Sequence, residues 1–289
     1  MNKASFFTLA LISKGFIFAQ ASDPVSLGFL SKFNSDLDSS NSVSVNHASL
    51  KTGLPLKKTD SVFVALSATY VTEEYDFDGD FQPWDDFQQL SIGIPVFIDF
   101  SDDWKWSSIY SVASSKEQGA DFNDSLSYGV VTSLNYRYSD TLTIGPGFGL
   151  YSQIEDSASI YPIISLNWQI TPDWKLATGP SEGASSGANL YLQYSALDRW
   201  NFTAGAYYQS NRFRLSSSSD ASTNGVGETE VTAAYAVAKY RAHDSFSVSL
   251  IAGLSVGDSY ELSNSSGRKL REESTDAATF VGVRVNYNF

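Results

Sequence analysis

Residues 90–100 read LSIGIPVFIDF, and apolar side chains occupy every second position of this stretch. Side chains alternate between two faces in a β-strand, whereas a helix needs apolar residues three and four positions apart. The stretch is therefore predicted to be a strand with one apolar face and one small or polar face. The apolar series is Leu90, Ile92, Ile94, Val96, Ile98 and Phe100, and the intervening positions begin with Ser91 and Gly93.

The same alternation returns along most of the chain, so the fold class is all-β. Counting the alternating segments back from the C-terminus gives 14 predicted antiparallel strands. Twelve strands behind an N-terminal extension is the alternative. The predicted strands are 24–35, 40–54, 59–76, 87–100, 104–116, 125–138, 141–153, 158–170, 174–182, 187–196, 200–214, 228–242, 245–260 and 273–289.

Short turns alternate with long loops between these segments. The short turns carry an Asp, as in Asp103-Trp104 and Asp173-Trp174, and Asp suits a turn because its side chain bonds the local backbone. The longer connections are polar and cover 77–86, 116–124, 216–227 and 263–272. Long loops at one end and short turns at the other are typical of a transmembrane up-and-down β-barrel.

Tryptophan positions favour the same architecture. Five of the six tryptophans lie close to a short-turn Asp, and Trp84 alone lies in a long loop. An indole ring has an apolar body and one N–H donor, so it settles at the boundary between bilayer and water. We predict a membrane-interface girdle formed by Trp104, Trp106, Trp168, Trp174 and Trp200.

Composition excludes several classes of protein. The 289 residues hold 19 Lys and Arg against 32 Asp and Glu, for a formal charge of −13, and they contain no Cys. A nucleic acid is therefore not an expected partner, since phosphate binding needs a surplus of basic residues. Without Cys there is no disulfide framework, thiolate metal site or cysteine nucleophile. We expect no cofactor.

Residues 1–21 are predicted to be an export signal, which leaves 22–289 as the barrel. Lys3 gives a positive start, an apolar stretch follows, and Ala19-Gln20-Ala21 has the small-x-small pattern that precedes cleavage. A retained membrane helix fits less well, because Lys14 divides the apolar run and about 20 uninterrupted residues are needed.

The C-terminal segment is the most specific piece of the sequence. Its alternating apolar face ends in an aromatic residue, and its members are Thr279, Val281, Val283, Val285, Tyr287 and Phe289. This segment resembles the closing strand of bacterial outer-membrane β-barrel proteins. The resemblance implies a Gram-negative type of envelope, contact with outer-membrane lipids, and a barrel-assembly machinery that reads Tyr287 and Phe289 as an insertion signal.

A barrel with its apolar side chains toward lipid directs the small and polar ones inward. Barrel diameter grows with strand number, so 14 strands are expected to leave a water-filled interior unless a loop folds into it. We therefore predict a porin-like channel for passive diffusion of small polar solutes. Its candidate lining charges are mixed in sign, with at most a weak cation preference from the overall charge: Glu73, Asp99, Lys105, Arg137 and Arg284.

Two other functions stay open at this point. A structural or ligand-binding protein would act through its external loops, where Asp76, Asp78 and Asp80 are a weak Ca²⁺ candidate, since alternate oxygen ligands suit that ion. A hydrolase in the barrel wall would need an activating histidine, and His47 and His243 are the two available. We expect no enzyme, and we leave a homo-oligomer open.

Overall fold

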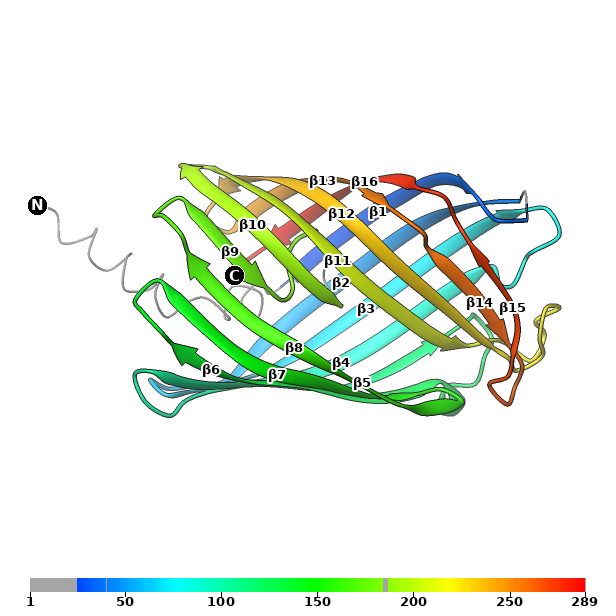
Figure 1. Ribbon diagram of the computed structural model, residues 1–289, viewed down its shortest axis with the longest axis horizontal. Helices are drawn as coiled ribbons and strands as arrows, with labels where there is room; N and C mark the ends of the chain where they lie inside the picture. The colour runs from blue at the N-terminus through cyan, green and yellow to red at the C-terminus, as the bar shows by residue number, and fades with distance from the viewer. Residues whose placement is uncertain (1–24, 40, 184–186, 289) are drawn as a thin grey trace, which may run out of the picture.

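A computed structural model of the protein describes residues 25–39, 41–183 and 187–288, so the predicted signal at 1–21 lies outside the described residues. Sixteen strands and one short 3-10 helix make up this part of the chain (Figure 1). They are β1 (Val25–Asp36), β2 (Ser42–Lys58), β3 (Val62–Asp78), β4 (Asp86–Asp99), β5 (Trp104–Lys116), η1 (Asn123–Ser125), β6 (Leu126–Arg137), β7 (Leu142–Gln153), β8 (Asp156–Gln169), β9 (Trp174–Thr178), β10 (Ala188–Leu197), β11 (Trp200–Arg214), β12 (Val226–His243), β13 (Phe246–Ser255), β14 (Ser259–Ser263), β15 (Lys269–Ser274) and β16 (Ala278–Tyr287).

Fourteen of these strands close into a barrel. Neighbours from β1 to β13 pair in sequence order, β13 pairs with β16, and β16 pairs with β1. Every pairing in this ring is antiparallel, as hairpin connections require. The prediction of 14 antiparallel strands is confirmed, and the 12-strand alternative is wrong.

The last two strands differ from their predicted extents. The segment predicted as one strand over 245–260 breaks after Ser255, and the loop predicted at 263–272 forms most of the hairpin β14–β15. The chain turns between β13 and β14 at Gly257, whose φ of 64° favours glycine. β14 then pairs with Val226–Glu230 of β12 above the β12–β13 ladder, so the hairpin extends the wall at the long-loop end.

Acidic pH is expected to loosen this hairpin. Lys269 Nζ lies 2.8 Å from Glu272 and 2.7 Å from Glu261 across it. The hydrogen bond from Lys269 lowers the pKa of the Glu272 carboxyl. A lowered folded-state pKa contributes stability above the unfolded value of about 4.3, and that contribution is lost as the pH falls through the folded-state value.

Hydrogen exchange measured with correction for intrinsic rates tests this. Protection of the β14 and β15 amides is expected to fall below about pH 4, while the β7–β8 hairpin keeps its protection. Glu272→Gln is expected to lower protection at neutral pH and to flatten the pH dependence. Equal protection of β14 and β15 at both pH values would contradict the assignment.

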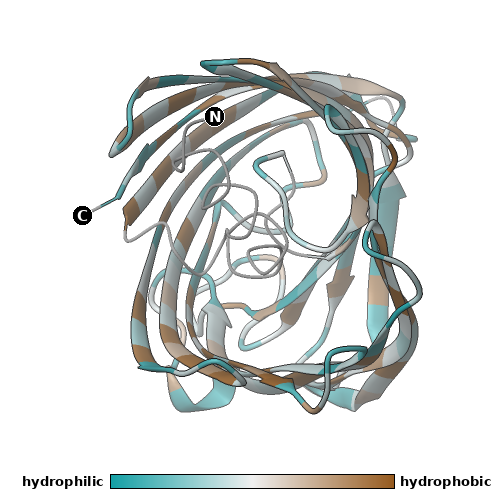
Figure 2. Ribbon diagram, turned by 90° about the vertical axis from the view of Figure 1, so that its left-hand side faces the viewer, coloured by the Kyte–Doolittle hydropathy of each residue, from teal (hydrophilic) through white to brown (hydrophobic). Residues whose placement is uncertain are grey.

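The two faces of the wall have the predicted polarity. Leu90, Ile92 and Ile94 are 46%, 47% and 41% exposed on the outer surface, whereas Ser49, Ser133 and Asn286 are buried on the inner one. Figure 2 looks along the barrel and shows the strands enclosing a central space, with alternating bands of hydropathy along each strand. The six short turns lie at the left end of Figure 1, and the β1–β2, β3–β4, β5–β6, β7–β8 and β11–β12 connections lie at the right.

The shortest strand of the barrel is β9. This strand has only five residues and pairs with β8 at three positions, Asn167 to Gln169. The Thr178 hydroxyl ends the ladder, because it accepts a hydrogen bond from Leu166 N at 2.8 Å and donates one to Ile164 O at 2.9 Å. The following connection is thereby free to leave the wall, and its described residues turn into the barrel.

Candidate functional site

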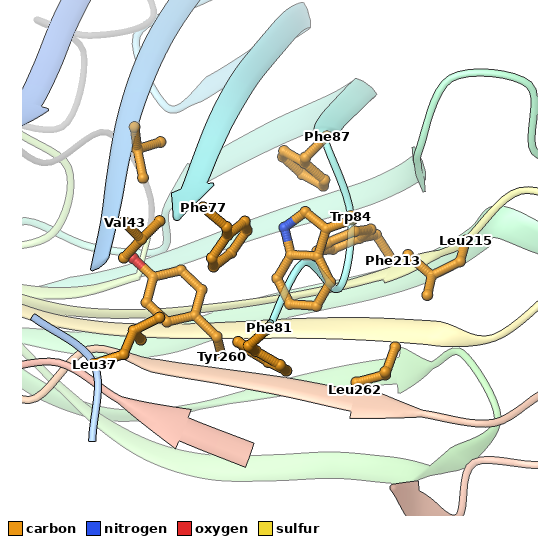
Figure 3. Packing of buried hydrophobic residues seen from close by; sticks show 11 residues of the cluster. Leu37, Val43, Phe77, Phe81, Trp84, Phe87, Phe213, Leu215, Tyr260 and Leu262 are labelled. Atoms are coloured by element: carbon orange, nitrogen blue, oxygen red, sulfur yellow. The ribbon is translucent and has the colours of Figure 1, made fainter. Parts of the chain in front are cut away.

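Aromatic side chains gather inside the barrel at its long-loop end (Figure 3). Trp84, from the β3–β4 loop, packs against Phe213 of β11 with ring centroids 5.0 Å apart. Phe77 contacts both Trp84 and Tyr260 of β14. We call this group the mouth cluster; its members are Leu37, Val43, Val45, Phe77, Phe81, Trp84, Phe87, Phe213, Leu215, Tyr260 and Leu262.

The mouth cluster joins parts of the wall that lie far apart around the ring. β3 and β11 are separated by β1, β2, β12, β13 and β16 on one side and by β4 to β10 on the other. Because Phe81 and Trp84 come from the loop between β3 and β4, this loop reaches across the barrel end. The loop therefore constricts the mouth. This is the exception named in the sequence-based prediction, which expected an open interior unless a loop folds into it.

A second contact draws the ends of β5 and β11 together. Arg214 and Lys116 form a parallel bridge, and Glu117 N donates to Arg214 O at 2.8 Å. The Glu117 carboxylate accepts a hydrogen bond from Ser216 N at 2.7 Å, and burial raises the pKa of this carboxyl. Both strand ends are thus held in the mouth of the barrel.

The Arg214 guanidinium connects four segments at the same level. Its Nη2 lies 2.6 Å from the Glu155 carboxylate in the β7–β8 turn. Its other donors meet carbonyl oxygens of Asp124 at 3.2 Å and Asn224 at 2.9 Å. A planar guanidinium with several donors in fixed directions suits such a junction.

Charged side chains lie directly beneath the mouth cluster. Lys32 Nζ is 2.8 Å from Asp258 Oδ2 and also bonds Tyr260, and both charged groups are almost fully buried. Glu73, a predicted lining residue, accepts a hydrogen bond from Tyr75 and lies 3.0 Å from His47 Nδ1. Sequence reasoning missed Lys32 and Asp258, which lie 226 residues apart in the chain.

A row of polar side chains follows the inner face at a lower level, and we call it the polar belt. The belt runs from β9 through β10, β11, β12, β13, β16 and β1 to β2, and cross-strand register makes each member a neighbour of the next except between β10 and β11, where Gln193 is opposite Thr203. A hydrogen bond of 3.4 Å between Gln193 and Asn201 links β10 to β11. The members are Lys175, Gln193, Asn201, Lys239, Ser249, Arg284, Gly28 and Ser49.

The connection after β9 reaches this belt from inside the barrel. Glu182 forms an ion pair with Lys239 and accepts a hydrogen bond from Ser249. Arg284 Nη1 donates to the Glu182 carbonyl at 2.5 Å. Ser181 lies 2.6 Å from the Tyr235 hydroxyl, which fixes the loop against β12. The sequence did not single out Glu182, since it lies in a Gly- and Ser-rich stretch.

The remaining predicted lining charges lie at the short-turn end of β4, β5 and β6. Lys105 Nζ is 2.9 Å from Asp99 Oδ2, so these two charges form a pair across β4 and β5. Arg137 ends β6, and its backbone N donates to Asp103 O at 2.7 Å. The structure therefore separates the five predicted charges into different groups, of which Arg284 alone lies in the polar belt.

Three of the five predicted girdle tryptophans share one geometry at the short-turn end. Trp104, Trp174 and Trp200 each lie beside a tyrosine on the neighbouring strand, with ring planes tilted by 49°, 42° and 45° and centroids 4.9, 4.7 and 4.9 Å apart. Trp168 is 41% exposed, and Trp106 Nε1 donates to Thr132 Oγ1 at 2.8 Å. At the C-terminus, Tyr287 is 45% exposed and pairs with β1 and β13, and Phe289 lies outside the described residues.

Other predicted sites are not assembled. Asp76 and Asp78 end β3 and Asp80 follows in the loop, and in the described part of the chain no three His, Cys, Asp or Glu side chains group to hold a metal. The Ca²⁺ site stays a prediction. His243 accepts a hydrogen bond from Ser245 N at 3.2 Å in a short turn. Among the residues described, no helix is long and apolar enough to cross a membrane.

Comparison with solved structures finds matches to outer-membrane channels, one of them with a TM-score above 0.5. The COG4313 outer membrane channel from Pseudomonas putida F1 matches with 9% identity over 92% of this chain and 94% of that one, with a TM-score of 0.52. The NanC porin matches with 8% identity over 92% and 100% of the two chains (TM-score 0.41). A Pseudomonas aeruginosa FadL homologue matches with 12% identity over 92% and 89% (TM-score 0.43).

At 9% identity the likeness to the COG4313 channel concerns the fold, and it agrees with the resemblance of the C-terminal strand to outer-membrane barrels. A search of curated proteins finds no match. The model of the family described as a domain of unknown function (DUF6268) matches residues 31–288. The chain therefore belongs to the DUF6268 family, and its fold is that of an outer-membrane β-barrel.

Proposed function

We propose that the protein is a porin-like channel of the outer membrane that lets small polar solutes diffuse passively. One observation carries the proposal: a polar belt across eight strands faces the inside of a closed barrel of 14 strands. Barrels of eight strands fill their interior with side chains, and those of 16 to 18 leave an aqueous channel. Fourteen strands with Ser, Gly and Asn on the inner face are wide enough for water and small solutes.

The outer surface supports the membrane location. Large apolar side chains such as Ile160 and Ile164, which are 68% and 67% exposed, would be costly in water over so wide an area. Trp–Tyr pairs at the short-turn end are the side chains expected at a bilayer boundary. In this proposal outer-membrane lipids surround the barrel, and the assembly machinery reads Tyr287 and Phe289.

The geometry gives less support to a hydrolase in the wall. His47 lies 3.0 Å from Glu73 inside the barrel. The same arrangement of an acid beside a histidine occurs in structural pairs and in catalytic ones, so it does not favour an enzyme. His243 lies in a short turn at the opposite end from the mouth. In a nucleophilic site the acid bonds one ring nitrogen of the histidine and a hydroxyl bonds the other. The contacts shown for His47 and His243 are made by Nδ1, to Glu73 and to the Ser245 backbone.

Conductance across a planar lipid bilayer tests the proposal. The protein folded in detergent and added to one side is expected to give stepwise, long-lived current increases that scale with salt concentration. Heat-denatured protein from the same preparation is the control and is expected to give none. Membranes that contain folded, inserted protein and stay electrically silent would overturn the proposed function.

A further inference from the structure

The ladder of the barrel wall is interrupted between β8 and β11. Both strands run on toward the long-loop end, whereas β9 and β10 stop short of it (Figure 1). β9 pairs with β8 only at residues 167–169, and β10 begins at Ala188, opposite Tyr208 of β11. Beyond these positions, among the described residues, no strand pairs on this side with residues 157–165 of β8 or with residues 209–213 of β11. We call the region between these two stretches the wall interval.

The connection from β9 to β10 leaves the wall interval instead of filling it. Glu182 forms an ion pair with Lys239 on the inner face of β12, so the first part of the connection lies inside the barrel. The connection returns to the wall at Gly187, whose φ is 78°. A Cβ at Gly187 would lie 2.1 Å from Tyr208 O, so this close approach needs glycine and closes the interval on its short-turn side.

Side chains close the wall interval on its long-loop side. Arg212 Nε donates to Ile154 O at 2.7 Å, which joins β11 to the β7–β8 turn. The Arg212 charge is paired, because Nη1 lies 2.6 Å from the Glu228 carboxylate. The interval is therefore bounded on four sides, and the charge of Arg212 at its border is neutralised.

Even-numbered residues of β8 direct their backbone N–H and C=O groups toward the wall interval. Ile170 N donates to Trp174 O on the β9 side, and Leu166 N donates to Thr178 Oγ1 on the same side. The direction alternates along an antiparallel strand. Pro162 is an even-numbered residue in the middle of the unpaired stretch, and it has no N–H. Proline in a sheet lies at an unpaired edge, and it makes that edge a poor template for an added strand.

Side-chain exposure supports the interruption. Ile160 and Ile164 are 68% and 67% exposed on the outer surface. Leu150, the cross-strand partner of Ile160 on β7, is 39% exposed and has a paired strand on either side. The larger exposed fraction of Ile160 shows that side chains on the β11 side do not cover it.

The wall interval lies at the depth of the bilayer. Eight residues separate Trp168 of the predicted girdle from Ile160. That is about 26 Å along the strand and about 20 Å in height at a tilt of about 40°, within an apolar band of about 25 Å. Unpaired backbone groups at this depth are tolerated only where they are buried in protein or line a water-filled cavity. The edge of β8 therefore needs water, and the barrel interior is the nearest source.

The wall interval meets the interior below the mouth cluster. Gln209 and Asn211 face inward on β11 beside it, with a hydrogen bond of 3.2 Å between their side chains. Phe213, the next inward-facing residue, belongs to the mouth cluster. A molecule that enters through the wall thus bypasses the constricted mouth. It meets apolar side chains, Ile160 and Ile164, on the lipid side and uncharged polar groups on the inner side.

We propose that the wall interval is a side portal through which single-chain amphiphiles with an uncharged polar head pass between the outer leaflet and the barrel interior. The head bonds water, the edge of β8 and the amides of Gln209 and Asn211, while the tail stays against Ile160 and Ile164. The absent upper parts of β9 and β10 correspond to two strand spacings of about 4.8 Å each, which is room for one alkyl chain. This inference goes beyond the proposed channel for small polar solutes, and it rests on the same membrane-embedded barrel.

Amide hydrogen exchange of the protein in lipid nanodiscs, followed by NMR, tests whether water reaches the edge. The amides of Ile160 and Ile164 are expected to exchange at least about 100-fold faster than those of Tyr161 and Ile163, which point toward β7. Residues 149–150 of β7 are the control, because both have ladder partners and are expected to be protected. Slow exchange at Ile160 and Ile164 would show that the edge is covered, and it would overturn the portal.

Quenching by a nitroxide on the head of an amphiphile tests the class of solute. The chain has no Cys, so Ile163→Cys and Ser91→Cys each give one site for a bimane label. Both side chains are half-buried on the inner face, six and eight residues from the short-turn ends of β8 and β4, and only Ile163 borders the wall interval. The TEMPO ester of stearic acid has an uncharged head and one tail. It is expected to quench Ile163→Cys at least about two-fold more than Ser91→Cys, because a complete ladder keeps the head outside the wall.

Further probes and a second reporter keep the comparison specific. Water-soluble 4-hydroxy-TEMPO is expected to quench both labels alike, and so is a two-chain phosphatidylcholine with the nitroxide on its head. Gln209→Cys, on the opposite border of the wall interval, is expected to behave as Ile163→Cys does. Heat-modifiable migration on gels verifies that each variant is folded.

The portal and the channel fail separately. Equal quenching of the Ile163→Cys and Ser91→Cys labels by the stearate ester would overturn the portal, and stepwise conductance in planar bilayers would then leave the channel standing. Selective quenching in a protein that carries no current would retain the portal and reject the channel.

Discussion

Replacing Trp84 with Ala is expected to raise single-channel conductance several-fold. Trp84 is 3% exposed and touches rings from β3, β11 and β14, so it holds the β3–β4 loop across the mouth. Loss of a buried Trp side chain costs about 3–5 kcal/mol. The β3–β4 loop is expected to undock locally under that loss, while the barrel ladder keeps its own stability.

Two matched variants separate the constriction from other effects of the substitution. Trp84→Phe keeps an aromatic ring in the cluster and is expected to keep the low conductance. It also removes a buried Nε1–H that has no acceptor among the described residues, so it costs little or nothing in stability. Trp168→Ala removes an indole from the outer surface, where it is 41% exposed, and conductance is expected to stay as in the wild type.

Single-channel recording at fixed voltage measures all three. Equal conductance of Trp84→Ala and the wild type would show that the mouth cluster does not limit the current. Flickering in place of a stable increase would still agree with undocking, because a released loop moves in and out of the mouth.

The barrel itself could be predicted from the sequence because its signals are local. A side-chain period of two sets the faces of a strand, and an Asp shortly before an aromatic or branched residue marks each short turn. The ranges predicted for 104–116 and 200–214 are the extents of β5 and β11. Where the local signal ends, as at Gly257, the prediction ran on to residue 260 and missed the hairpin above.

The interior could not be predicted, because its contacts join distant parts of the chain. Trp84 stood out as the one tryptophan in a long loop, and the aromatic residues around it were the only sign that this loop turns inward. The polar belt depends on the register of eight strands, and a shift of one residue in any ladder would reverse the faces. Alternation identified Arg284 as inward-facing. That Lys175, Lys239 and Glu182 also lie at the polar belt could be seen only once the strands were paired in the folded barrel.

Replacing Asp258 with Ala is expected to cause the largest loss of stability. Asp258 is fully buried, and its Oδ2 accepts hydrogen bonds from Lys32 at 2.8 Å and from Ser255 at 2.7 Å. The substitution leaves the Lys32 ammonium buried without its counter-ion. Removing one partner of a buried pair costs about 3–5 kcal/mol, far more than loss of an exposed pair.

The loss is expected to be largely reversible by a second substitution. Lys32→Met in the Asp258→Ala background removes the buried charge and keeps most of the volume of the side chain, so the double variant is expected to recover more than half of the lost stability. Lys269→Met is the control: it breaks the pairs with Glu261 and Glu272 on the exposed hairpin and is expected to cost less than about 1 kcal/mol. Urea unfolding in lipid vesicles, followed by tryptophan fluorescence, measures each variant. If the double variant were as unstable as Asp258→Ala alone, the cost would come from the lost hydrogen bond between Ser255 and Asp258 and not from the unpaired lysine.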